Sequence, residues 1–199
     1  MPSAYVVKVD DLSVTINRLD DAPTKIRRTA SRAINRTLTR TRTASERSIR
    51  EQVAFPVGYL KPSAGRLKVS ETSKPNSLSG AVRGRQSATS LARFALNRPK
   101  RGGQVRLRVK PNRTTVIPGA FLINLRRGDG SGDGFNRGLA VRLKPGERLR
   151  NKRNARQLGN GLYLLYGPSV DQVFQQVARE EAEPAGQFLE QEFLRQLEL

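Results

Sequence analysis

The commonest general base and the commonest zinc ligands are missing, because the 199 residues include no histidine and no cysteine. No Gly-x-x-x-x-Gly-Lys-Ser/Thr run is present either, so there is no P-loop. Carboxylates gather near the C-terminus at Glu180, Glu181 and Glu183, with no partner acid or base in a motif around them. We therefore predict a solvated helix face rather than a catalytic pair. The protein is predicted to have no catalytic residue, no metal and no cofactor, and not to be an enzyme.

The segment Asp129-Gly130-Ser131-Gly132-Asp133-Gly134 resembles the opening of a calcium-binding loop. Its oxygen-bearing residues stand at positions one, three and five, and glycine stands at position six. The twelfth position, which should be a bidentate glutamate, is Ala140. We therefore predict a flexible hairpin tip over residues 128–138, and an ion site there is the alternative.

Basic residues dominate the charge, with 37 Lys and Arg against 17 Asp and Glu, a net charge of +20. The excess lies in residues 22–50 and 61–156, whereas residues 171–199 hold two basic and seven acidic residues. Such a field favours nucleic acid, an acidic protein surface or an anionic membrane as partner. No stretch approaches the roughly 18 apolar residues of a membrane span, and we expect no membrane partner. The acidic C-terminal segment is suited to a basic neighbour, such as the next copy of the chain.

Basic side chains are therefore the candidate site residues, contacting double-stranded DNA or an acidic partner. Such contacts are independent of base sequence and sensitive to salt. Aromatic residues are sparse and not interleaved with the arginines, so stacking on single-stranded bases is not expected. The candidates are Arg32, Arg36, Arg40, Arg98, Lys100, Arg101, Arg106, Arg108, Lys152 and Arg153.

A long helix is expected to position the first three candidates. From Pro23 onwards, apolar and small residues recur at spacings of three, four or seven, and Pro56 helps to end the pattern. Asp20 or Asp21 could cap this helix. About 30 residues make a rod of roughly 45 Å. Its stripe of apolar and small residues is narrow, which favours close packing against a neighbouring element, and its arginines lie mostly off that stripe.

Short strands are expected to position the remaining candidates. The clearest signal is at 104–110, where Val105, Leu107 and Val109 alternate with three basic residues. The apolar segment 116–125 is broken by Pro118-Gly119. We also expect strands near residues 5–9, 66–70, 78–83, 139–143 and 162–166, and a helical turn near 91–96.

A second helix is expected at about 169–199, where the helical period returns and where Pro184 and Gly186 should kink or split it. The order of elements predicts an α+β fold. In it, a long N-terminal helix and a C-terminal helix pack on a small, mostly antiparallel β-sheet with extended basic loops. We expect one domain over residues 1–199, with arms at about 56–103 and 128–138.

Three segments together resemble a known family. They are Arg32-Ala33-Ile34-Asn35-Arg36, the basic glycine-containing stretch at 98–103 with the strand after it, and Val116 followed by Ile117, Pro118, Gly119, Ala120 and Phe121. In order and spacing, the sequence is similar to the phage minor tail protein Z family, the lambda-type tail-completion proteins. At residues 117–121 we expect Pro118-Gly119 to form a bend and Ala120-Phe121 to re-enter the core, and a docking surface is the alternative.

The resemblance implies a structural virion protein that completes the head-proximal end of a phage or prophage tail at the head–tail neck. It implies a homo-oligomer, expected as a hexameric ring, with the tail terminator, tail tube and neck proteins as partners. Double-stranded DNA in the lumen is a further expected contact. The implied location is the virion, and the host cytoplasm during assembly. The alternative function is a free, sequence-independent double-stranded-DNA-binding protein.

Overall fold

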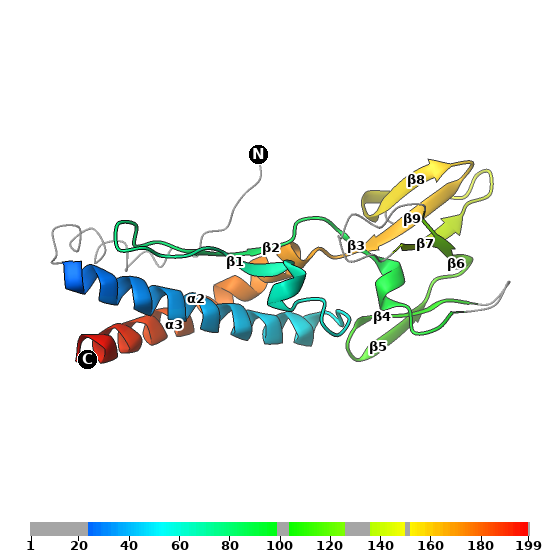
Figure 1. Ribbon diagram of the computed structural model, residues 1–199. Coiled ribbons are helices and arrows are strands. Elements are labelled where there is room, and N and C mark those ends of the chain that lie inside the picture. The colour runs from blue at the N-terminus through cyan, green and yellow to red at the C-terminus, as the bar shows by residue number, and fades with distance from the viewer. Residues whose placement is uncertain (1–23, 99–103, 126–135, 150–151, 199) are drawn as a thin grey trace. The chain divides into compact units, whose positions relative to one another are not determined.

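The computed structural model describes residues 24–98, 104–125, 136–149 and 152–198 and shows the predicted α+β class (Figure 1). The chain forms two compact units. We call residues 1–49, 61–85 and 171–199 the helical unit, and residues 50–60 and 86–170 the β unit. The strand expected at 5–9, the expected helix cap at Asp20 or Asp21 and nearly all of the loop at 128–138 lie outside the described residues.

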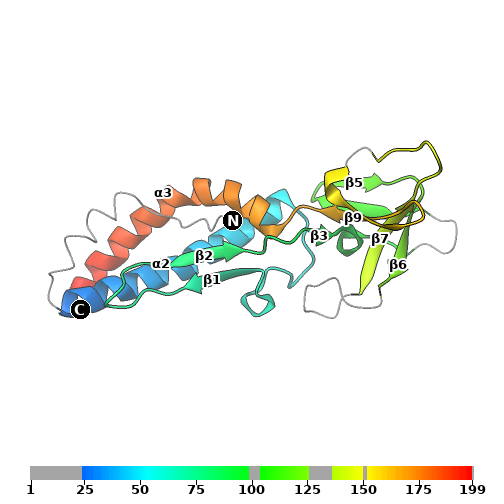
Figure 2. The same cartoon turned by 90° about the horizontal axis from the view of Figure 1, so that it is seen from above.

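In the helical unit, two long helices run side by side with a β-hairpin (Figure 2). The elements are α2 (Thr24–Gln52), the short 3-10 helix η1 (Pro62–Ala64), β1 (Leu67–Glu71), β2 (Ala81–Gly84) and α3 (Val170–Leu197). Strands β1 and β2 pair antiparallel. Asn35 joins the hairpin to α2, because its amide nitrogen donates to the Ser73 carbonyl at 2.9 Å and its amide oxygen accepts from the Ser73 N–H at 2.8 Å.

Side-chain contacts show that α2 and α3 are antiparallel. Ser48 donates to Glu181 at 2.8 Å, and Arg36 lies 2.8 Å from Glu192. As residue numbers fall along α2, they rise along α3. We call this line of polar contacts the helix seam. Beside it, Ala33, Ile34 and Leu189 belong to the apolar core of the unit.

In the β unit, every strand pair of the described residues is antiparallel. One sheet has the order β3-β9-β7-β6, with β8 also paired to β9, and β4 and β5 form a separate ribbon. The elements are β3 (Thr89–Ser90), η2 (Leu91–Phe94), β4 (Arg106–Lys110), β5 (Arg113–Val116), β6 (Ala120–Asn124), β7 (Arg137–Arg142), η3 (Lys152–Asn154), β8 (Ala155–Gly159) and β9 (Leu162–Gly167).

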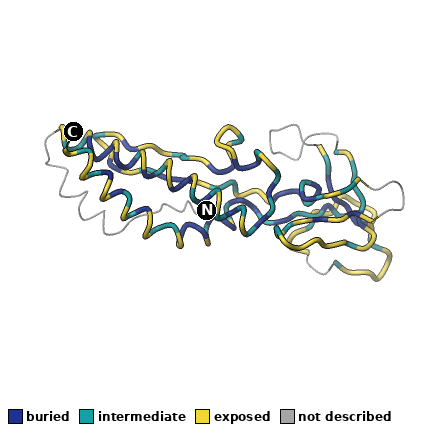
Figure 3. The backbone as a smooth tube through the Cα atoms, turned by 90° about the horizontal axis from the view of Figure 1, so that it is seen from below, coloured by how far each residue is buried: buried dark blue, intermediate teal, exposed yellow. Residues whose placement is uncertain are grey.

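The core of the β unit lies between the ribbon and the larger sheet. Val105 and Leu107 of the ribbon segment belong to one cluster with Ala120, Leu139 and Val141 of β6 and β7. Buried segments alternate with exposed ones along the tube in Figure 3. The β4 segment thus buries one row of side chains and leaves the other row exposed, whereas all four residues of β5 are exposed.

The alternation expected at 139–143 is wrong, although a strand is present. Residues 138–141 of β7 are all buried. The reason is that both faces of β7 are covered. Leu139 and Val141 lie in the core cluster, and the small residues of the other row, Gly138 and Ala140, stand beside the larger Ile123 and Leu164 of the neighbouring strands. A central strand that is covered on both faces shows a continuous apolar run rather than a period of two.

Pro184 does not split the C-terminal helix, which is continuous from Val170 to Leu197. A proline removes one backbone hydrogen bond, to the carbonyl four residues earlier. Here Pro184 and Glu180 are both exposed, so water can solvate that carbonyl. Helix α3 curves along its length in Figure 2.

Candidate functional site

Five exposed arginines share one side of α2. At about 100° per residue, they fall within roughly a third of the helix circumference. The first four follow one another every fourth residue, a rise of about 6 Å per step. We call this surface the arginine face, and its members are Arg28, Arg32, Arg36, Arg40 and Arg47.

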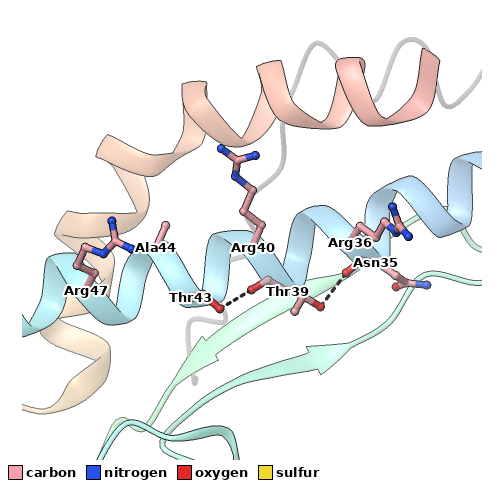
Figure 4. Close-up of a pocket in the computed structure, with 7 residues that line it drawn as sticks. All are labelled: Asn35, Arg36, Thr39, Arg40, Thr43, Ala44 and Arg47. Atoms are coloured by element: carbon pink, nitrogen blue, oxygen red, sulfur yellow. Dashed lines mark hydrogen bonds between the residues drawn. The ribbon is translucent and has the colours of Figure 1, made fainter. Parts of the chain in front are cut away.

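A cleft of about 720 Å³ runs along part of the arginine face (Figure 4). Among the described residues, it is lined by Asn35, Arg36, Thr39, Arg40, Thr43, Ala44 and Arg47. The two threonine hydroxyls donate back to the carbonyls of Asn35 and Thr39, each at 3.0 Å, so their protons are already used within the helix. The charge in the cleft therefore comes from its three guanidinium groups.

Two of these guanidinium groups are held by α3. Arg36 binds Glu192, and the Arg40 guanidinium lies 4.1 Å from the centre of the Phe188 ring. A cation over an aromatic face is attracted to it. Within the described residues, Arg28, Arg32 and Arg47 have no such partner. The arginine face thus has a part fixed against α3 and a part open to a ligand.

Glu192 supplies the negative charge at the fixed part. Its side chain is only 6% exposed, and it accepts hydrogen bonds from Arg195 at 2.8 and 3.0 Å and from Gln196 at 2.6 Å. The bonds from Arg195, and then those from Gln196 and Arg36, lower the pKa of Glu192 from 4.5 to about 2, against the opposing effect of burial. Bonding to Glu192 in turn raises the pKa of Arg195. Glu192 is therefore an anion at neutral pH.

Arg42 departs from the expectation that the helix arginines point away from the buried stripe. It is buried, its Nε donates to the Leu67 carbonyl at 3.2 Å, and it forms an ion pair with Glu46 at 2.7 Å. A guanidinium can be buried when its donors are satisfied in this way. Arg42 thus joins α2 to β1 and is not available to a partner.

A second basic surface lies on the ribbon of the β unit. We call it the basic ribbon: Arg106, Arg108 and Lys110 of β4, with Arg113 of β5. All four side chains are exposed, and none has an ion-pair partner among the described residues. Alternate residues of a strand are about 6.8 Å apart, so β4 presents a row of positive charges, with a shift in the pairing register between Leu107 and Lys110. The predicted alternation of 104–110 places Arg106, Arg108 and Lys110 correctly.

The ribbon is anchored at its start by Asn97. Its amide nitrogen donates to the Gln104 carbonyl at 2.9 Å, and its amide oxygen accepts from the Arg106 N–H at 2.8 Å. Val105 is fully buried and Leu107 is 2% exposed. Buried apolar residues and a side-chain clamp therefore fix the direction in which the basic row points.

The remaining basic candidates belong neither to the arginine face nor to the basic ribbon. Arg98 is exposed, and Lys152 and Arg153 lie exposed in η3. Lys100 and Arg101 lie outside the described residues. The candidate residues omit the following members and contacts of the two surfaces: Arg28, Arg47, Lys110, Arg113, Phe188 and Glu192. Arg47 could have been found, because it stands seven residues after Arg40, whereas nothing in the sequence pairs Glu192 with Arg36.

The segment 117–121 forms a tight turn between β5 and β6. The Ala120 N–H donates to the Ile117 carbonyl at 3.2 Å, and Gly119 has a φ of +69°. Proline at the second position and a positive φ at the third are the features of a type II turn. Ala120 is buried, Ile117 packs against the same core, and Phe121 is partly buried. The segment thus brings the chain back into the core, as expected for a bend at Pro118-Gly119.

The net charge is divided unequally between the two units. The β unit has 19 basic and four acidic residues, a net charge of +15, and the helical unit has 18 basic and 13 acidic residues, a net charge of +5. Counting along the sequence hides this difference, because three separate segments form the helical unit. Most of the acidic residues thus belong to the unit that carries the arginine face, and few belong to the unit that carries the basic ribbon.

Among the described residues, no group of three or more carboxylates is placed to hold a metal ion. None of the described helices has the length and apolar character to cross a membrane.

One family model matches the chain, that of prophage minor tail protein Z, and it covers residues 11–199. No curated protein and no solved structure matches. The match includes every helix and strand of the described residues. The chain therefore belongs to the prophage minor tail protein Z family.

Proposed function

We propose that this protein completes the head-proximal end of the tail at the head–tail neck, as a ring of identical copies. Its family gives it a structural role in the phage tail, and so a place in the virion. In our proposal, the β unit faces DNA in the lumen, the helical unit faces neighbouring proteins, and the chain catalyses no reaction.

The observation that supports this proposal is the unequal charge of the two units. The +15 of the β unit includes a fixed, exposed basic row without ion-pair partners among the described residues. Such a row binds phosphates regardless of base sequence, by releasing counterions. A lumen-facing protein needs this property, because different stretches of the genome pass it.

The position in the particle can be tested by cryo-electron microscopy of complete virions. We expect density for this fold at the junction of head and tail. Density for it only at the distal end of the tail, or along the tail tube, would contradict the proposal while leaving the family intact.

The role of the basic ribbon can be tested by measuring affinity for duplex DNA over a range of salt concentrations. Replacing Arg106, Arg108 and Lys110 by alanine should weaken binding and reduce the salt dependence, by roughly one unit of slope for each phosphate that the variant no longer neutralises. A matched control replaces Lys61, Lys68 and Lys74, three exposed lysines of the helical unit. Equal weakening in both triple variants would show that net charge, and not the ribbon, governs binding.

The same charge asymmetry favours a second candidate, a free double-stranded-DNA-binding protein. The two functions differ in what the triple ribbon variant does to infection. If the variant loses DNA binding while particles assemble normally with unchanged infectivity, the free DNA-binding function is favoured. If particles fail at head–tail joining, the neck function is favoured.

A further inference from the structure

Helix α3 has an acidic side that faces away from α2. Glu181 and Glu192 lie on the helix seam, and Glu183 and Glu190 lie about half a turn from Glu181 around the helix. Both outer glutamates are exposed. They have no ion-pair partner among the described residues. Near the end of the same helix, Leu194 is 54% exposed.

Helix α2 has the complementary side. Arg28 and Arg32 are exposed, stand one helical turn apart, and have no ion-pair partner within the described residues. The helical unit therefore carries an unpaired basic surface on one helix and an unpaired acidic surface on the other.

The chain itself shows that surfaces of these two helices fit each other. Along the helix seam, Arg36 and Ser48 of α2 meet Glu192 and Glu181 of α3. Arginine binds carboxylate well because its planar group offers several donors in a fixed geometry. The outer surfaces carry the same two kinds of side chain, arginine on α2 and glutamate on α3, as the Arg36–Glu192 pair of the seam.

We propose that the outer acidic side of α3 in one copy, Glu183 and Glu190, docks on Arg28 and Arg32 of α2 in the next copy. This contact would be the interface between neighbouring copies in the proposed ring. The inference therefore rests on the proposed function. The two surfaces differ, so the contact is head-to-tail. Each copy uses one surface of each kind, and repetition yields a ring if the rotation closes.

The charge of the helical unit favours a second copy over DNA as the occupant. The unit has 13 acidic residues against 18 basic ones, so a duplex would meet carboxylates as well as arginines. A second copy brings the opposite charge to each surface. It also covers Leu194, which would otherwise remain in water.

Two charge-reversal proteins test this interface. The first carries Arg28→Glu and Arg32→Glu, and the second carries Glu183→Lys and Glu190→Lys. Native mass spectrometry and sedimentation would give the assembly state of each. Alone, each should need about tenfold or more concentration than the wild type for half-assembly, because like charges then face each other.

Mixing the two proteins in equal amounts is the decisive measurement. In the mixture, each reversed surface finds an oppositely charged one on the other protein, and each unchanged surface does so too. We expect alternating rings with an even number of copies. A restored ring also shows that both variants fold. The control, Lys68→Glu with Lys74→Glu on the β1–β2 hairpin, should assemble like the wild type.

The outcomes separate the interface from the proposed function. If each variant alone forms rings as well as the wild type does, this interface is wrong, but the proposed ring still stands. Variants that fail to assemble both alone and when mixed would also overturn it. A wild-type chain that stays monomeric at every concentration would overturn the ring itself. Loss of duplex binding by the arginine variant, with assembly unchanged, would identify DNA as the occupant.

Discussion

Glu192 connects two parts of the chain that are distant in sequence. It lies on α3, is nearly fully buried, and binds Arg36 of α2 as well as two neighbours on its own helix. Such an arrangement stabilises the ionised carboxylate, which is why the pKa of Glu192 falls to about 2. The residue therefore links packing of the two helices to pH.

We expect Glu192 to stabilise the fold above pH 4.5 and to lose this contribution as the pH falls towards about 2. The folded-state pKa is the lower one, so folding favours the ionised form, and protonation favours unfolding. Thermal unfolding of wild type and Glu192→Gln should differ most near pH 6, and the difference should shrink below pH 4.5. Glu180→Gln, at an exposed position of α3 outside the proposed interface, is the control. A difference that does not change with pH would refute the linkage.

Gly119 is required by the backbone rather than by packing. Its φ is +69°, and a Cβ at this position would meet no atom within 4 Å. We therefore expect Gly119→Ala to destabilise the protein by about 1 kcal/mol, from strain alone. Gly119→Asn should cost less, because asparagine tolerates positive φ better. Chemical denaturation measures both, and equal destabilisation by the two substitutions would mean that the positive φ is not the cause.

At the scale of residues, local chemistry predicts more than distant pairing does. Pro118-Gly119 predicts its own turn, because the geometry depends on those two residues. The contacts of Glu192 and the burial of Arg42 depend on elements far along the chain, and no local pattern carries them. The direction in which an arginine points is therefore the least predictable property of this candidate site.

Strand β7 is the element on which the β unit depends most. It is paired on both edges, and residues 138–141 are buried. Leu139 is fully buried within the core cluster shared with the ribbon. The ribbon's direction therefore depends on packing against this strand.

Leu139→Ala should destabilise the β unit by about 2–5 kcal/mol, through reduced apolar burial and an unfilled cavity. Leu158→Ala removes the same atoms from β8, where the side chain is 46% exposed, and should cost less than about 1 kcal/mol. Urea denaturation followed by circular dichroism compares the two. Similar destabilisation by both substitutions would show that β7 is not the centre of the core.

The period of apolar residues predicts both helices well because each is long and half-buried. Helix α2 spans Thr24–Gln52, close to the expected rod that begins after Pro23. The strand at 104–110 is predicted for the same reason, since one of its faces is buried and the other exposed. β7 lacks this contrast, and its burial pattern could not be read from alternation.

At the scale of the whole molecule, the division into two units cannot be found by reading along the chain. The helical unit is assembled from three separate segments, and its acidic residues come largely from the last of them. Segment charges therefore mix residues that belong to different units. The expectation of one domain over residues 1–199 with extended arms stays a prediction.

The placement of α2 and α3 at opposite ends of the sequence also determines when the helix seam can form. Helix α2 ends at Gln52, and α3 begins at Val170. A ribosome adds about 5–20 residues per second, so Arg36 and Arg40 emerge several seconds before Glu192 and Phe188 exist. The β unit is synthesised during that interval. Helix α2 can therefore pack in the helical unit only after the last residues have been synthesised. A chain truncated before α3 would keep Arg36 and Arg40 but lack Glu192 and Phe188, which contact them.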